Sequence, residues 1–76
     1  LSDTSWIGAD AELVVPFDAS GLGRISLLIG GQVVEIAARR APAFASVPSA
    51  EFARCIVDQL DGDTAIVLPR ERLVAG

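Results

Sequence analysis

GLGRISLLIGGQVVEIAARR, residues 21–40, is the stretch that predicts the fold, and it has the pattern of a β-hairpin. Gly30-Gly31 at its centre suits a two-residue turn, because glycine reaches positive φ without steric cost. Side chains alternate between the faces of a strand, so this turn gives one nearly all-apolar face and one mixed face. A slip of one residue would break that match, so the register is well specified. The apolar face pairs Ile29 with Gln32, Leu27 with Val34 and Ile25 with Ile36; the mixed face pairs Leu28 with Val33, Ser26 with Glu35 and Arg24 with Ala37.

The residues before the hairpin predict a first, half-buried strand. Every second residue from Ile7 to Phe17 is apolar, while Asp10 and Glu12 fall on the alternate face. Pro16 should end the pairing of this strand or mark a sheet edge. Residues 18–21, DASG, have turn composition and lead into the hairpin.

Residues 41–50, APAFASVPSA, interrupt the strand pattern. Pro42 and Pro48 argue against a long helix, so we expect a surface loop with Phe44 or Val47 turned inward. Ten residues is long for a hairpin connection. The chain should therefore cross over another element after the third strand.

Residues 51–60, EFARCIVDQL, fit two interpretations. A helix would place Phe52, Cys55, Ile56 and Leu60 on one face. A strand would lead into Asp61-Gly62, a strong hairpin signal. We favour the strand, because residues 64–68, TAIVL, are strand-like, end at Pro69 and need a partner. The predicted register pairs Val57 with Ile66, Ile56 with Val67 and Cys55 with Leu68.

Five short strands with a break after the third predict an all-β fold. A closed barrel suits this pattern because closure removes exposed sheet edges. We expect a small five-stranded OB-like β-barrel over residues 6–69. A flexible N-terminal segment would occupy residues 1–5 and a flexible C-terminal tail residues 70–76.

Composition argues against an enzyme. The 76 residues contain no histidine and no lysine, so neither Cys55 nor any serine has a conventional base to activate it. Asp58, Asp61 and Asp63 do not follow the calcium-loop spacing. The single cysteine excludes an internal disulfide. We expect no catalytic residue, no metal and no cofactor.

The net charge of −4 argues against phosphate-backbone binding. No apolar run approaches the roughly 20 residues that span a bilayer. The sequence begins at Leu1, which suggests a piece of a longer protein.

Several motifs are similar to the C-terminal soluble domain of NfeD-like proteins. Trp6-Ile7-Gly8 followed by ADAELVVPF resembles the first strand of that domain. Gly21-x-Gly23-Arg24-Ile25, Gly30-Gly31-Gln32 and EIAAR at 35–39 resemble its second and third strands. Val47-Pro48, DGDT at 61–64 and the strand ending at Pro69 resemble its closing hairpin. The family usually has a glycine before its fourth strand, where this chain has Ser49-Ala50-Glu51.

This resemblance implies an OB-fold barrel anchored to a membrane in a bacterial parent protein. It implies a soluble domain of an inner or cell membrane protein, on the cytoplasmic side. It also implies a partner, a flotillin- or stomatin-like membrane scaffold protein. The domain would then contribute to membrane organisation or quality control.

We expect the partner surface to combine apolar residues off the main core face with the one basic cluster. Patches of this kind mark partner sites. A homo-oligomer remains open. The alternative is an OB-fold module for single-stranded nucleic acid, although such modules combine a basic groove with stacking aromatic residues. The expected partner surface is Leu22, Leu28, Val33, Arg39 and Arg40.

Overall fold

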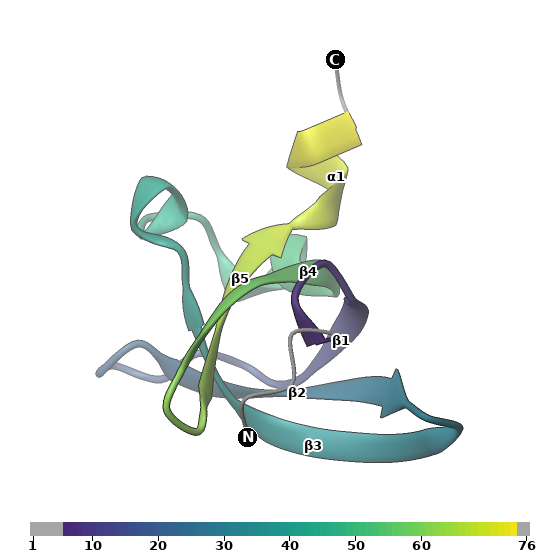
Figure 1. Ribbon diagram of the computed structural model, residues 1–76. Coiled ribbons are helices and arrows are strands. Elements are labelled where there is room, and N and C mark those ends of the chain that lie inside the picture. Colours follow the sequence, from purple (N-terminus) through teal and green to yellow (C-terminus); the bar gives the residue numbers. More distant parts are fainter. Residues whose placement is uncertain (1–5, 75–76) are drawn as a thin grey trace.

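The computed structural model describes residues 6–74, with side chains through Arg72, and shows a closed five-stranded β-barrel (Figure 1). The strand order around the barrel is β1-β2-β3-β5-β4, with β4 returning to β1. All neighbours are antiparallel except β3 and β5. This topology confirms the all-β, OB-like prediction. The strands are β1 (Asp10–Val15), β2 (Leu22–Ile29), β3 (Gln32–Arg40), β4 (Arg54–Asp61) and β5 (Thr64–Pro69).

The central hairpin has the predicted register throughout. Ile25 lies opposite Ile36, and Leu28 lies opposite Val33. Gly30 and Gly31 both have positive φ, at 58° and 82°, as a type I′ turn requires. Local turn chemistry and side-chain alternation therefore determined this pairing.

The first strand is shorter than predicted. It begins at Asp10, and an extra residue at Val14 shifts its register against β2. A bulge of this kind changes which face the following residues take. Val15, predicted to face the core, is consequently 49% exposed. Pro16 follows the end of the strand, as expected.

The crossing segment contains two short 3₁₀ helices, η2 (Pro42–Phe44) and η3 (Ser49–Phe52). Pro42 is the first residue of η2, where a missing N–H costs nothing. Phe52 is fully buried and Val47 nearly so, whereas Phe44 is half-buried. This segment seals one end of the barrel.

Residues 54–61 form a strand, which confirms the strand interpretation for most of residues 51–60. The predicted register with β5 was wrong. The turn lies at Gly62-Asp63, and an extra residue at Asp58 adds a bulge, so Val57 lies opposite Val67. Gly62 has positive φ but Asp63 does not, and a glycine at the first turn position is what a type II′ turn needs.

Residues 70–74 form a short helix, α1 (Arg70–Val74), where the sequence indicated a flexible tail. Two ion pairs connect this helix to the barrel and to η3. Arg70 lies 3.6 Å from Asp10, and Arg72 forms two hydrogen bonds with Glu51. Long-range pairs of this kind leave no periodic signal in five residues. The predicted flexible segment 1–5 and residues 75–76 lie outside the described residues.

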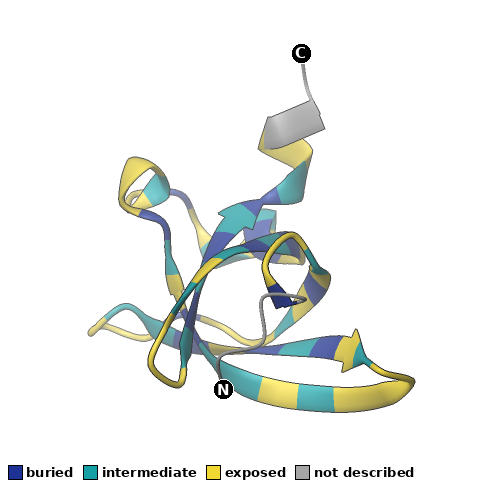
Figure 2. Cartoon of the chain, in the orientation of Figure 1, coloured by how far each residue is buried: buried dark blue, intermediate teal, exposed yellow. Residues whose placement is uncertain are grey.

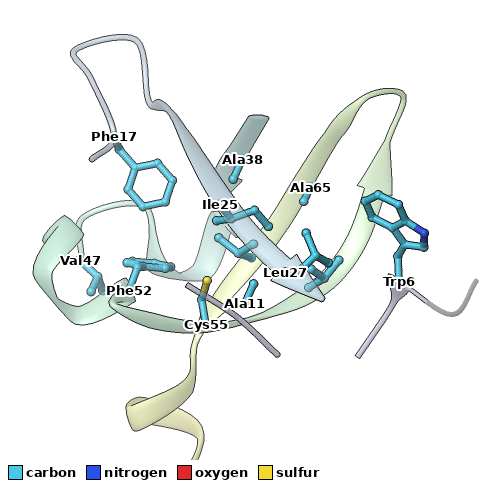
Figure 3. Packing of buried hydrophobic residues seen from close by; sticks show 12 residues of the cluster. Trp6, Ala11, Phe17, Ile25, Leu27, Ala38, Val47, Phe52, Cys55 and Ala65 are labelled. Atoms are coloured by element: carbon cyan, nitrogen blue, oxygen red, sulfur yellow. The ribbon is translucent and has the colours of Figure 1, made fainter. Parts of the chain in front are cut away.

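The core fills the barrel from end to end (Figures 2 and 3). Trp6 covers one end beside the β4–β5 hairpin, and Phe17 and Phe52 meet edge to face at the other, with centroids 5.1 Å apart. The buried cluster is Trp6, Ala11, Phe17, Ile25, Leu27, Ala38, Val47, Phe52, Cys55, Val57, Ala65 and Val67.

Gly23 allows β1 and β2 to approach closely. A Cβ atom there would lie 2.7 Å from the backbone oxygen of Val15. We expect Gly23→Ala to reduce the free energy of unfolding by about 1–3 kcal/mol, because backbone cannot yield as a side chain can. Urea unfolding would measure this. Gly31→Asn is the control, because a side chain there meets no neighbouring atom and asparagine tolerates positive φ. An equal loss of stability in the two variants would show that the close approach at Gly23 is not the cause.

Candidate functional site

The hairpin extends beyond the barrel wall as an arm, residues 28–36. Leu27 is the last β2 residue paired with β1, and Ala37 is the first β3 residue paired with β5. Figure 1 shows this end of the hairpin reaching away from the β4–β5 turn. The arm follows from the register, since β5 begins at Thr64, opposite Ala37, five residues after the start of β3 at Gln32.

Leu28 and Val33 form an exposed apolar pair on the outer face of the arm. They lie directly opposite each other and are 65% and 72% exposed, the largest values for large hydrophobic residues among side chains 6–72. The pairing places them in a non-hydrogen-bonded position, where side chains on neighbouring strands come closest. The structure therefore brings two of the five expected partner-surface residues together on one exposed face.

A groove of about 420 Å³ runs from this pair across the barrel wall. Two carboxylates and two guanidinium groups also line it. Arg70, from α1, pairs with Asp10 there, at 3.6 Å. The sequence did not indicate this groove because its walls come from four strands and a helix. Its lining is Asp10, Ala11, Glu12, Ser26, Leu27, Leu28, Val33, Arg54 and Arg70.

The other predicted partner residues do not join this groove. Leu22 pairs with Arg39 at the opposite end of the hairpin, and Leu28 lies six positions after Leu22 along β2, about 20 Å away. Arg39 donates a hydrogen bond to the backbone oxygen of Ser20 at 3.1 Å. The five residues therefore occupy two separate regions.

Arg40 is engaged within the fold. Its Nε donates to the backbone oxygen of Val47 at 2.7 Å, and its guanidinium lies 4.3 Å from the centroid of the Phe17 ring. Adjacent strand residues point to opposite faces, so Arg39 and Arg40 do not form one basic patch. In this conformation Arg40 seals the barrel end.

Cys55 lies in the core, with none of its surface exposed. Burial, and then the Asp10 and Glu12 carboxylates, raise the pKa of its thiol to about 12. A thiol of this pKa supplies almost no thiolate at neutral pH, and the thiolate is the nucleophile. Its position is that of a small apolar core residue.

Within residues 6–74, no three potential metal ligands come together, and no helix is long and apolar enough to cross a membrane. No family model, curated protein or solved structure matches this chain. The resemblance to NfeD-like domains thus stays a prediction.

The buried thiol can be tested by alkylation. We expect Cys55 in the folded chain to resist iodoacetamide at mildly alkaline pH and to react fully in urea. Mass spectrometry would follow the adduct. Rapid reaction in the absence of denaturant would show that the thiol is accessible and ionised.

The α1 contact should depend on pH. The hydrogen bond from Arg72 lowers the pKa of Glu51 from 4.5. The ion pair between Glu51 and Arg72 therefore stabilises the position of α1 at pH values above 4.5. The contact should be lost as the pH falls through the lowered pKa of Glu51. The protection factors of the α1 amides, which are the exchange rates corrected for the intrinsic effect of pH, should fall at acid pH. Glu51→Gln should lower the protection of the α1 amides already at neutral pH. Asp63→Asn, at an exposed turn, should leave that protection unchanged.

Proposed function

We propose that this chain is a non-catalytic protein-interaction domain that binds through the groove beside the arm. The observation that carries the proposal is the exposed Leu28–Val33 pair, held by a rigid type I′ hairpin. Exposed apolar side chains that pack against each other at the border of a groove are typical of a binding surface. A preformed backbone also reduces the ordering cost of association.

The charges around the groove would select the partner. Asp10 and Glu12 lie on one wall, and Arg54 and Arg70 lie on the others. Such mixed charges around an apolar centre favour a partner with a matching pattern and disfavour like charges. The apolar pair would supply most of the affinity and the charged groups the orientation.

We further propose that the domain belongs to a membrane-anchored NfeD-like protein and docks on a flotillin- or stomatin-like scaffold. The support is the set of glycine, turn and strand motifs in the sequence, together with the OB-like strand order. Leu28 and Val33 would contact the scaffold directly.

Single-stranded nucleic acid is the weaker candidate. Binding of this kind uses exposed aromatic rings and a basic groove. Trp6, Phe17 and Phe52 are buried, and the net charge is −4. None of these three rings is available for stacking in this conformation.

Leu28→Asp tests the docking surface. We expect about a 30-fold or larger loss of affinity for a purified flotillin-like protein, since a buried charge at a central contact costs 2 kcal/mol or more. The fold should survive because Leu28 is 65% exposed. Isothermal titration calorimetry would give the affinity and circular dichroism the fold.

Val15→Asp is the matched control. Val15 is also an exposed aliphatic residue, at the other end of β1, paired with Arg24. It should leave binding unchanged. Equal affinity of wild type and Leu28→Asp would contradict the proposed docking surface. Absence of binding by wild type would contradict the proposed scaffold partner.

A further inference from the structure

The edge of β3 is unpaired along the arm. β2 pairs with one side of β3 from Gln32 to Arg39, but β5 pairs with the other side only from Ala37 to Arg40. No strand among the described residues lies beside the remaining edge, from Gln32 to Ile36. An open edge of this kind presents backbone groups that can pair with another strand.

The register identifies which backbone groups are open. Hydrogen-bonded and non-hydrogen-bonded pairs alternate along an antiparallel ladder, and the two-residue turn makes Ile29–Gln32 a hydrogen-bonded pair. The backbone N–H and C=O groups of Val34 therefore form hydrogen bonds with β2. Those of Val33 and Glu35 point away from β2, toward the open side. The other end of the strand supports this assignment. Ala41 lies an even number of residues from Val33 and Glu35, so its backbone groups point to the same side. Its N–H donates a hydrogen bond to the backbone oxygen of Val67 on β5, at 2.9 Å.

Features that usually protect an edge are scarce here. Residues 28–36, LLIGGQVVE, contain no proline and no lysine, and the one charged residue is Glu35. Val33, whose backbone faces the open side, is 72% exposed. Gln32, Val33 and Glu35 along this edge are exposed, whereas Val34 and Ile36 are half-buried.

We propose that this edge binds a second copy of the chain, with the two β3 strands antiparallel and Val34 on the two-fold axis. The edge is self-complementary, because two outward-facing residues flank Val34 symmetrically. In this register Val33 faces Glu35 of the second copy, and each open N–H meets an open C=O. Isologous pairing of this kind closes as a dimer.

The side chains and turns allow this approach. Val34 is half-buried, on the face that packs against the core, so the two copies of Val34 would meet there. Gly30 and Gly31 lie at the end of the paired segment and Gly62 lies at the turn before β5; a Cβ at any of them would meet nothing within 4 Å. These three glycines therefore carry no side chain toward the junction, and Asp63, the other residue of the β4–β5 turn, lines a pocket together with Glu35 and Ile36.

The dimer would align the two apolar pairs. Leu28 and Val33 of both copies would share one face of a continuous sheet, so one dimer would present two identical patches side by side. This inference does not depend on the proposed function, because it concerns the chain alone. A partner with repeated sites would bind such a dimer more tightly than one copy.

Amide exchange and sedimentation test the pairing. As protein concentration rises, the sedimentation coefficient should increase, and exchange at Val33 and Glu35 should slow. Val34 should be protected at every concentration by β2. Val33→Pro should keep the chain monomeric, since it removes an outward N–H without breaking a bond to β2. Val33→Ala, which retains that N–H, should still dimerise. Glu35→Gln, which removes one negative charge of each copy from the same face of the joined sheet, should dimerise more strongly.

Cysteine crosslinking tests the register. Opposed non-hydrogen-bonded residues have Cα atoms about 4.5 Å apart, within disulfide range. Val34→Cys should therefore oxidise to a covalent dimer, while Gln32→Cys, opposite Ile36 of the second copy, should form far less. Wild type, with only the buried Cys55, is the blank.

Three results would overturn the proposal. The first is a monomer at every concentration with freely exchanging Val33 and Glu35 amides, which would leave the edge to an extended segment of another protein. The second is unchanged dimerisation in Val33→Pro. The third is equal crosslinking at positions 32 and 34.

Discussion

The parallel pairing between β3 and β5 is the constraint on which the rest of the structure depends. It joins strands from the two halves of the chain and closes the barrel. Because the first residue of β5, Thr64, lies opposite Ala37, closure uses only the second half of β3. The first half is left as the arm, with an exposed face and an open edge. The architecture and the candidate surface thus have one origin.

The crossing segment makes that closure stable. It runs over one end of the barrel and inserts Phe52 against Phe17. Arg40 covers both rings and satisfies the backbone oxygen of Val47. A residue that belongs to a basic dipeptide in the sequence thereby becomes part of the packing. Its methylene and guanidinium groups contribute area and a cation–π contact rather than a surface charge.

The described surface offers features that suit the binding proposed above. The one thiol is buried with a raised pKa, and the carboxylates that line the groove stand opposite guanidinium groups. What remains accessible is an apolar pair, a mixed rim of charge and an unpaired strand edge. Each of these favours association with another polypeptide. The face and the edge of the arm are separate surfaces, so one copy could use both at once.

The sequence by itself determined the elements that depend on neighbouring residues. Gly30-Gly31 and the alternation around it specified the hairpin register, and the strand count with its break predicted the barrel. Only the tertiary structure decided the bulges at Val14 and Asp58, the turn at Gly62-Asp63, the helix at 70–74 and the groove. Turn chemistry and side-chain period act over a few residues, so they can be seen in the sequence. Closure of the barrel determines which distant segments come into contact. The bulges, the Arg72–Glu51 ion pair and the walls of the groove all form at such contacts.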